Sequence, residues 1–196
     1  MSTSSFRGAA GGVLLLAVAL SACGSEADRD VPGSEAPPVV TAAGSPLEVA
    51  ERTGVPNARM PAPGVVTAGQ PTQRQLDALA SAGVRHFISL RPPSESGAGW
   101  EEAHASGAGY DFDRIPVSGA ASLTRENVEA FAALLDEAGS EPALVYCASS
   151  NRVGAMMALK AHWIDGVPAE EALELGRDAG LTRLEAPVRE LLGLEG

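Results

Sequence analysis

The sequence predicts an α/β domain with a mostly parallel central sheet, flanked by helices and followed by a helical C-terminal part. Short apolar segments that suit strands alternate with longer segments whose apolar residues recur at helical spacing. One short segment, Ala143–Tyr146, is wholly apolar, as expected for a central strand that is buried on both faces. This alternation implies right-handed crossovers and parallel strands, and such sheets bind ligands at the carboxyl ends of their strands.

The first 22 residues have the three-part layout of a secretory signal peptide. Arg7 precedes the apolar run Val13–Leu20, which is too short to span a bilayer stably, and small residues follow it. The segment Leu20–Cys23 resembles the lipobox of bacterial lipoproteins, in which the cysteine is lipidated and becomes the mature N-terminus. The alternatives are ordinary cleavage after Ala22, which leaves a free Cys23, or a chance cysteine. We expect an exported, membrane-anchored lipoprotein on the periplasmic or cell-surface side.

Residues 23–46 are rich in Pro, Gly, Ser and acidic residues, a composition that buries little apolar surface. We expect a disordered tether there, and one domain of ordinary size over residues 47–196. The formal net charge is −11, and it becomes −12 when the single positive charge of Arg7 leaves with the signal peptide. An acidic surface argues against nucleic-acid binding and against attraction to anionic lipids, so the lipid anchor would hold the protein at the membrane.

Local signals define the expected elements in order along the chain. Thr72 and Gln75 have the spacing of a capping box at a helix start, and Gly83 ends that helix. Thr124 can cap a later helix, and a second capping box begins at Thr182. The expected strands are 65–71 (ended by a turn), 84–90, 110–117 and 143–146, and the expected helices are 72–83, 100–106, 124–139, 151–165, 168–180 and 182–192.

Cys147 lies at the carboxyl end of the apolar strand Ala143–Tyr146. If Cys23 carries lipid, Cys147 is the one remaining cysteine and has no partner for an intramolecular disulfide. A lone free cysteine is unusual in an exported protein, because the compartment is oxidising. A buried structural cysteine is the alternative. The position at a strand end, where parallel sheets bind ligands, indicates a site.

The six residues from Cys147 to Arg152 would curl between a strand and the N-terminus of a helix. Backbone N–H groups there would point inward and bind an anion, helped by the helix dipole. The same field favours the thiolate of Cys147, and Arg152 adds a planar set of donors that suits a tetrahedral oxyanion. These features predict covalent catalysis through sulfur. The expected substrate-binding residues of the loop are Ala148, Ser149, Ser150 and Asn151.

Three segments carry a resemblance to a known bacterial family. They read TAGQPTQRQLDALASAGVRHFISLRPPSE, YDFDRIPVSGAASLTRENVEAFAALL and ALVYCASSNRVGAMMALKAHW. Over about residues 65–181 the chain resembles the phosphatase-like domain of the protein tyrosine phosphatase superfamily that is also found fused to β-lactamase-like hydrolases. The resemblance implies a dual-specificity-phosphatase-like fold in residues 47–196, with Cys147 as the nucleophile and Arg152 as the anion-binding arginine.

The loop departs from the H-C-x5-R-[S/T] signature of this superfamily. Tyr146 stands in place of the histidine, four residues instead of five separate Cys147 from Arg152, and Val153 replaces the hydroxyl residue, for which Ser149 or Ser150 could substitute. A six-residue loop resembles that of rhodanese-type sulfurtransferases, whose smaller cradle suits a persulfide. A sulfurtransferase that uses a Cys147 persulfide is therefore the alternative function.

The general acid is a second departure. Related phosphatases carry an aspartate in the loop after the strand that ends at Val117, where it protonates the leaving oxygen. Here that loop, Ser118–Ser122, contains no acid. Asp113 is the candidate general acid, with Asp111 beside it, although strand alternation and a solvated face explain both equally well. Sulfur transfer needs no such proton.

Arg91 ends the strand 84–90 and could bind substrate, although a surface ion pair explains it equally well. The three histidines have no metal-ligand spacing, so we expect neither a metal site nor a cofactor. The leading function is a cysteine-dependent phosphohydrolase acting on a small anionic phosphate ester, and in the sulfurtransferase alternative the substrate is a sulfane-sulfur donor. An idle anion-binding module is a third alternative. Loss of turnover in Cys147→Ser would separate the two enzymes from it.

Overall fold

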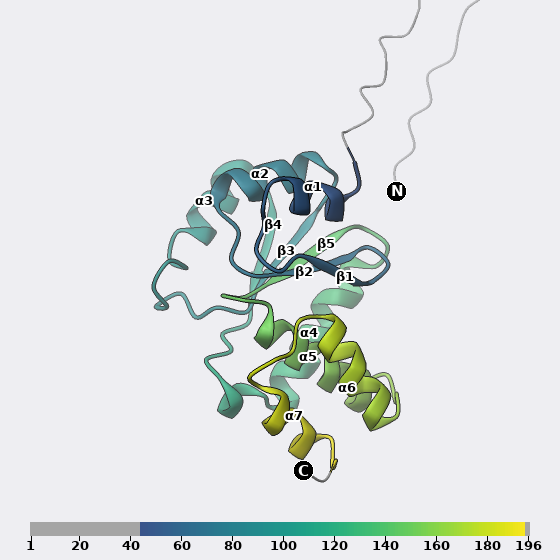
Figure 1. Cartoon of the computed structure of the whole chain (residues 1–196). Coiled ribbons are helices and arrows are strands. Elements are labelled where there is room, and N and C mark those ends of the chain that lie inside the picture. Colours follow the sequence, from purple (N-terminus) through teal and green to yellow (C-terminus); the bar gives the residue numbers. More distant parts are fainter. Residues whose placement is uncertain (1–43, 195–196) are drawn as a thin grey trace, which may run out of the picture. The chain divides into compact units, whose positions relative to one another are not determined.

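The computed structural model describes residues 44–194, and at their centre lies a five-stranded sheet (Figure 1). The strand order is β1-β2-β5-β3-β4. All neighbours are parallel except the edge strand β1, which pairs with β2 in antiparallel fashion. The predicted α/β class with a mostly parallel sheet is confirmed. The strands are β1 (Arg59–Ala62), β2 (Val65–Ala68), β3 (His86–Ser89), β4 (Asp111–Arg114) and β5 (Ala143–Tyr146).

Helices cover both faces of the sheet. Figure 1 shows α1, α2 and α3 on one face and α4 to α7 on the other, and each face has its own apolar core. The predicted helical C-terminal part is present as α6 and α7. The helices are α1 (Pro46–Arg52), α2 (Gln73–Ser81), α3 (Glu101–Ala108), α4 (Arg125–Ala138), α5 (Asn151–Trp163), α6 (Ala169–Asp178) and α7 (Glu185–Leu191), with a 3-10 turn η1 (Ala120–Ser122).

Strand alternation decides which face each side chain of β5 meets. Leu144 and Tyr146 pack with the core under α1 and α2, whereas Val145 and Cys147 pack with the core under α4 and α5. All four are buried because β5 lies between β2 and β3. The residue that precedes Cys147 therefore points to the opposite side of the sheet.

Several local signals act as expected. The Thr72 and Gln75 capping box forms, with the Thr72 backbone N–H donating to Gln75 Oε1 at 2.8 Å, and Thr124 caps α4. Gly83 follows α2 with φ +101°, a left-handed conformation that favours glycine. The expected second capping box is absent, because the Thr182 hydroxyl donates to Asn151 Oδ1 and α7 begins after Leu184.

Other boundaries differ from the sequence-based expectation. Helix α1 and strand β1 were not expected, and β4 ends at Arg114 rather than at residue 117. The chain beyond β4 still runs beside β3, since the Ile115 and Val117 backbone N–H groups donate to Ser89 O and Leu90 O. Within residues 44–194 no helix has the length and apolar character needed to cross a bilayer. The expected signal peptide, Cys23 and nearly all of the expected tether lie outside the described residues.

Candidate active site

Cys147 lies at the carboxyl end of β5, at the edge of the sheet where ligands bind in parallel folds. Its backbone N–H donates to Ala68 O of β2 at 3.2 Å, which continues the β2–β5 ladder up to the cysteine. The residue is 1% exposed and is a free cysteine. A central strand thus holds the sulfur in place at the start of the loop.

The loop turns its first carbonyl groups outward, toward a neighbouring segment. Gln70 N–H donates to Ala148 O at 3.3 Å, and the Asn57 side-chain amide donates to Ser149 O at 3.2 Å. A Cβ at Gly69 would lie 3.1 Å from Ala148 O, so glycine allows this close approach. Within the described residues, the backbone N–H groups of Ala148, Ser149, Asn151 and Arg152 donate to no protein acceptor, whereas Ser150 follows the bridge between Gly69 and Ser149. The N–H groups at this end of α5 are the candidate anion cradle, because the N-terminus of a helix leaves such donors unpaired.

The side chains of Ser150 and Asn151 point away from this cradle, into the C-terminal helices. Ser150 Oγ donates to Ala179 O at 2.8 Å. Asn151 Oδ1 accepts from the backbone N–H groups of Thr182 at 2.8 Å and Leu184 at 3.2 Å. Both were predicted to bind substrate. Their side chains instead brace the loop, so substrate binding by these residues stays a prediction.

Glycines bring α6 directly onto α5, just behind the loop. A Cβ at Gly154 would lie 2.2 Å from the Leu181 backbone nitrogen, and a Cβ at Gly176 would lie 2.7 Å from Ala158 Cβ. No side chain larger than hydrogen fits between the two helices at these positions. The C-terminal helices therefore form the back support of the loop.

Arg152 bends back over the site and is held by Glu95, a residue that the sequence did not single out. Its Nη1 donates to Glu95 Oε2 at 2.7 Å and to Val117 O at 2.8 Å, and its Nη2 donates to Glu95 Oε1 at 2.9 Å. A guanidinium has five N–H donors, and these bonds use both hydrogens of Nη1 and one hydrogen of Nη2. The edge formed by Nε and the second Nη2 hydrogen is left for an anion.

Electrostatics link Arg152 to the cysteine. Burial acts to lower the pKa of Arg152, but its hydrogen bond to Glu95, its interaction with the nearby Cys147 and the charge of Glu95 outweigh burial and raise that pKa. The arginine is therefore a permanent cation that lies near the thiol.

Arg91 holds Glu95 from the other side. The residue is 6% exposed, and its Nε donates to Glu95 Oε1 at 2.9 Å, its Nη1 to Gln70 Oε1 at 2.6 Å and its Nη2 to Ser96 O at 2.5 Å. These bonds place Arg91 within the support of the site rather than open to a ligand. The hydrogen bond from Arg152, followed by the charges of both arginines, lowers the pKa of Glu95, so Glu95 is a carboxylate and not a proton donor.

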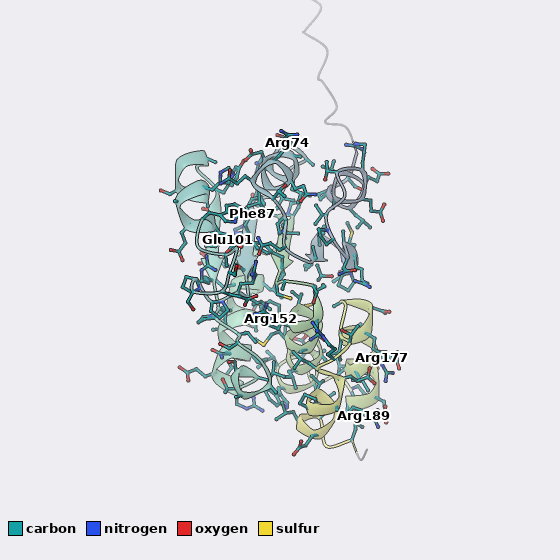
Figure 2. All side chains as sticks on the ribbon, turned by 60° about the vertical axis from the view of Figure 1, so that its left-hand side comes forward. Arg74, Phe87, Glu101, Arg152, Arg177 and Arg189 are labelled. Atoms are coloured by element: carbon teal, nitrogen blue, oxygen red, sulfur yellow. The ribbon has the colours of Figure 1, made fainter. Side chains whose placement is uncertain are left out.

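A buried ion pair extends this support toward α3. Gln70 Nε2 donates to Glu101 Oε1 at 2.8 Å, and Arg114 pairs with Glu101 Oε2 at 2.9 Å. Glu101 is fully buried, and Figure 2 shows it in the interior between α3 and the sheet. The Tyr146 hydroxyl lies near this carboxylate without a hydrogen bond of good geometry, and burial raises the pKa of Tyr146. The Tyr146 side chain therefore lies on the opposite face of the sheet from Cys147.

The structure does not bring Asp113 to the loop. Asp113 lies on the edge strand β4, where it pairs with Ile88 of β3, and burial, then the charges of Glu137 and Asp111, raise its pKa. None of these neighbours belongs to the cradle. The loop 118–122 forms a 3-10 turn in which the Ser118 backbone N–H donates to Ser122 Oγ at 3.1 Å. The role of Asp113 as a general acid remains a prediction without a supporting contact.

Comparisons with known proteins agree with this fold. Residues 56–183, more than half of the chain, match a family model described as a DSP-PTPase phosphatase fused to NAD+ kinase. A comparison with curated proteins gives no match. A phosphatase-like protein (DUF442) from Shewanella putrefaciens CN-32 has a similar solved structure, with 26% identity and a TM-score of 0.58, over 75% of this chain and 97% of that one.

Two further solved structures share the fold at lower identity. A phosphatase-like protein from Neisseria meningitidis Z2491 is 20% identical, with a TM-score of 0.56, over 67% of this chain and 96% of that one. Tk-PTP in its active form is 19% identical, with a TM-score of 0.54, over 70% and 96%. The dual-specificity-phosphatase-like fold predicted from the sequence is confirmed, and the matching model is named for an NAD+ kinase fusion rather than for β-lactamase-like hydrolases. The chain belongs to this DSP-PTPase family, within the protein tyrosine phosphatase superfamily.

Proposed function

We propose that the protein is a cysteine-dependent phosphohydrolase that forms a covalent intermediate on Cys147. One observation carries the proposal: Cys147 follows β5 and begins the loop at the N-terminus of α5, and Arg152, held by Glu95, lies near its sulfur with one edge of the guanidinium unpaired. The three equatorial phosphoryl oxygens would bind to the loop N–H groups and Arg152, and the leaving oxygen would lie opposite the sulfur, in line with its attack on phosphorus.

The reaction has two steps. The thiolate of Cys147 attacks phosphorus, the bond from phosphorus to the ester oxygen breaks, and phosphocysteine forms. Water then attacks phosphorus, releases phosphate and returns the thiolate. The leaving oxygen needs a proton or must leave as an anion, and residues 118–122 supply no carboxylate. Aryl phosphates, whose leaving groups are weak bases, should therefore be better substrates than alkyl phosphates.

The test measures phosphate release from an aryl phosphate and from an alkyl phosphate by the full chain. Turnover should be absent in Cys147→Ser and reduced by about 100-fold or more in Arg152→Lys, which removes the planar edge but keeps the charge. Thermal unfolding should show that both variants fold. Unchanged turnover in Cys147→Ser would exclude the proposed nucleophile.

Sulfur transfer is a second candidate, favoured by the short loop. The segment from Cys147 to Arg152 offers one backbone N–H fewer than the loop of the superfamily signature, and sulfur transfer needs no general acid. The thiolate would attack the outer sulfur of thiosulfate, the sulfur–sulfur bond would break, and sulfite would leave. The Cys147 persulfide would then pass its outer sulfur to a cyanide acceptor. Thiocyanate formation without phosphate release would favour this function. The absence of both activities would favour an idle anion-binding module.

We also propose that the protein is held at a membrane by lipid on Cys23. The support is the sequence Leu20-Ser21-Ala22-Cys23, in which a cysteine directly follows a small-residue cleavage site. An anchored phosphohydrolase would act outside the cytoplasm on soluble phosphate esters.

A further inference from the structure

Arg59, the first residue of β1, lies near the Cys147–Arg152 loop at the carboxyl edge of the sheet. Strand β1 runs antiparallel to β2, and Arg59 pairs with Thr67 near the carboxyl end of β2. Arg59 Nη1 donates to Asn57 O at 3.0 Å, while the Asn57 side chain donates to Ser149 O of the loop at 3.2 Å. The main-chain carbonyl that holds the arginine therefore belongs to a residue that also holds the loop.

The guanidinium of Arg59 also lies near Ser150. A Cβ at Gly180 would lie 3.2 Å from Arg59 Nη1 and 2.6 Å from Ser150 Cβ. Gly180 has φ +105°, so glycine is favoured there both by conformation and by the lack of space. Arg59 and Ser150 thus pack against the same glycine.

Backbone strain is concentrated at this corner. Among residues 44–194, Asn57 with φ 52° and Ser150 with φ 69° are the only non-glycine residues with positive φ. Such conformations cost about 1–3 kcal/mol each and cluster at functional sites. One strained residue presents Arg59 and the other shapes the loop, and the Asn57–Ser149 hydrogen bond joins the two.

The charge of Arg59 is not balanced by a neighbour. Arg91, Arg114 and Arg152 each pair with a carboxylate. Arg59 is half-buried and forms no ion pair within the described part of the chain, although acidic residues outnumber basic ones, 25 to 14. Its Nε and Nη2 groups have no protein acceptor there, and this edge suits bidentate binding of a carboxylate or phosphate.

We infer that Arg59 recognises a second anionic group on the substrate while the loop holds the phosphoryl group. The inference rests on the proposed phosphohydrolase function and narrows its substrate class to phosphate monoesters that carry a further carboxylate or phosphate. Arg59 touches the remote anion and takes no part in the chemical step, so it is a specificity residue.

Binding measurements test this without requiring turnover. The probes are phenylphosphonates with a carboxylate at the meta or para position and the matched neutral carboxamides, titrated into full-chain Cys147→Ser by calorimetry. The protein should bind a carboxylate probe more tightly than its carboxamide. Adding Arg59→Gln should reduce that preference by about three- to fivefold, the size expected for a partly exposed ion pair. Arg59→Lys should keep only part of it, because lysine keeps the charge but loses the bidentate edge.

Arg85→Gln is the matched control. Arg85 is exposed and lies just before β3, at the amino edge of the sheet, so the variant removes the same charge away from the loop and should leave the preference unchanged. Equal binding of carboxylate and carboxamide probes, or a preference that Arg59→Gln leaves intact, would overturn the inference while phosphohydrolase activity could stand. A preference that depends on Arg59, without phosphate release by the wild-type chain, would support the inference and reject hydrolysis. No binding of any phosphonate would overturn both.

Discussion

Replacing Glu95 with Gln tests whether this carboxylate positions the Arg152 guanidinium for an incoming anion. Glu95 accepts from Nη1 and Nη2 of Arg152 and from Nε of Arg91. The glutamine carries the same shape, but it has one acceptor oxygen and places an NH2 group against an N–H donor. Arg152 should then lose its fixed orientation, and the edge left for the phosphoryl group should no longer point to the loop.

The magnitude follows from the exposure of the pair. The Arg152 and Glu95 side chains are 12% and 30% exposed, which lies between an exposed pair worth about 0–1 kcal/mol and a buried pair whose disruption costs about 3–5 kcal/mol. We expect Glu95→Gln to lower the free energy of unfolding by about 2 kcal/mol. We expect kcat/KM to fall about tenfold, which corresponds to about 1.4 kcal/mol of binding to the transition state.

The assay combines urea unfolding with phosphate release from an aryl phosphate. Glu102→Gln is the matched control, because Glu102 also pairs with an arginine, Arg114, at 3.0 Å but is 64% exposed. That variant should change stability by less than about 0.5 kcal/mol and leave kcat/KM unchanged. If Glu95→Gln increased turnover or tightened phosphate binding, Glu95 would be a competitor for Arg152 rather than its support.

The pH dependence of stability gives an independent test of whether the charge of Glu95 stabilises the folded protein. The pKa of Glu95 is lowered in the folded state, so its stabilising effect is present above the unfolded value of about 4.3 and is lost as the pH falls through the folded value. The stability difference between wild type and Glu95→Gln should therefore be largest near neutral pH and shrink below about pH 4. A constant difference across that range would show that Glu95 acts through packing alone.

Three further predictions concern the helix support, the loop length and the anchor. Gly154→Ala should destabilise the protein by about 3 kcal/mol in urea unfolding, because its Cβ would overlap the backbone behind the loop, whereas Gly107→Ala on the exposed side of α3 should be neutral or stabilising by up to about 1 kcal/mol. Inserting one glycine between Ser150 and Asn151 should raise phosphatase activity and lower any transfer of sulfur from thiosulfate. If the insertion only damages phosphate release, loop length does not select the chemistry. Cys23→Ala should release the protein from membranes or leave it unprocessed in fractionation of a Gram-negative host, and a freely soluble wild type with unmodified Cys23 would refute the anchor.

Sequence reasoning succeeded where short-range signals govern the structure. Thr72 and Gln75 cap α2 because both partners lie within one helical turn, and the apolar run of β5 must be central because no polar face remains. The order of strand, cysteine loop and helix also follows from short-range patterns of apolar and polar residues. It places Cys147 at a strand end and Arg152 in the first turn of α5, as predicted.

The tertiary structure alone decided which charges meet around that loop. Glu95 reaches Arg152 across 57 residues of sequence, and Asn57 reaches Ser149 across 92. No local pattern specifies such contacts, because they arise from the order in which β1, β2, β5 and β3 bring their ends together. For the same reason Arg91 became an internal support and Asp113 remained apart from the cradle. By itself the sequence determined the candidate nucleophile and its anion loop, whereas the packing of distant segments determined which side chains orient that loop.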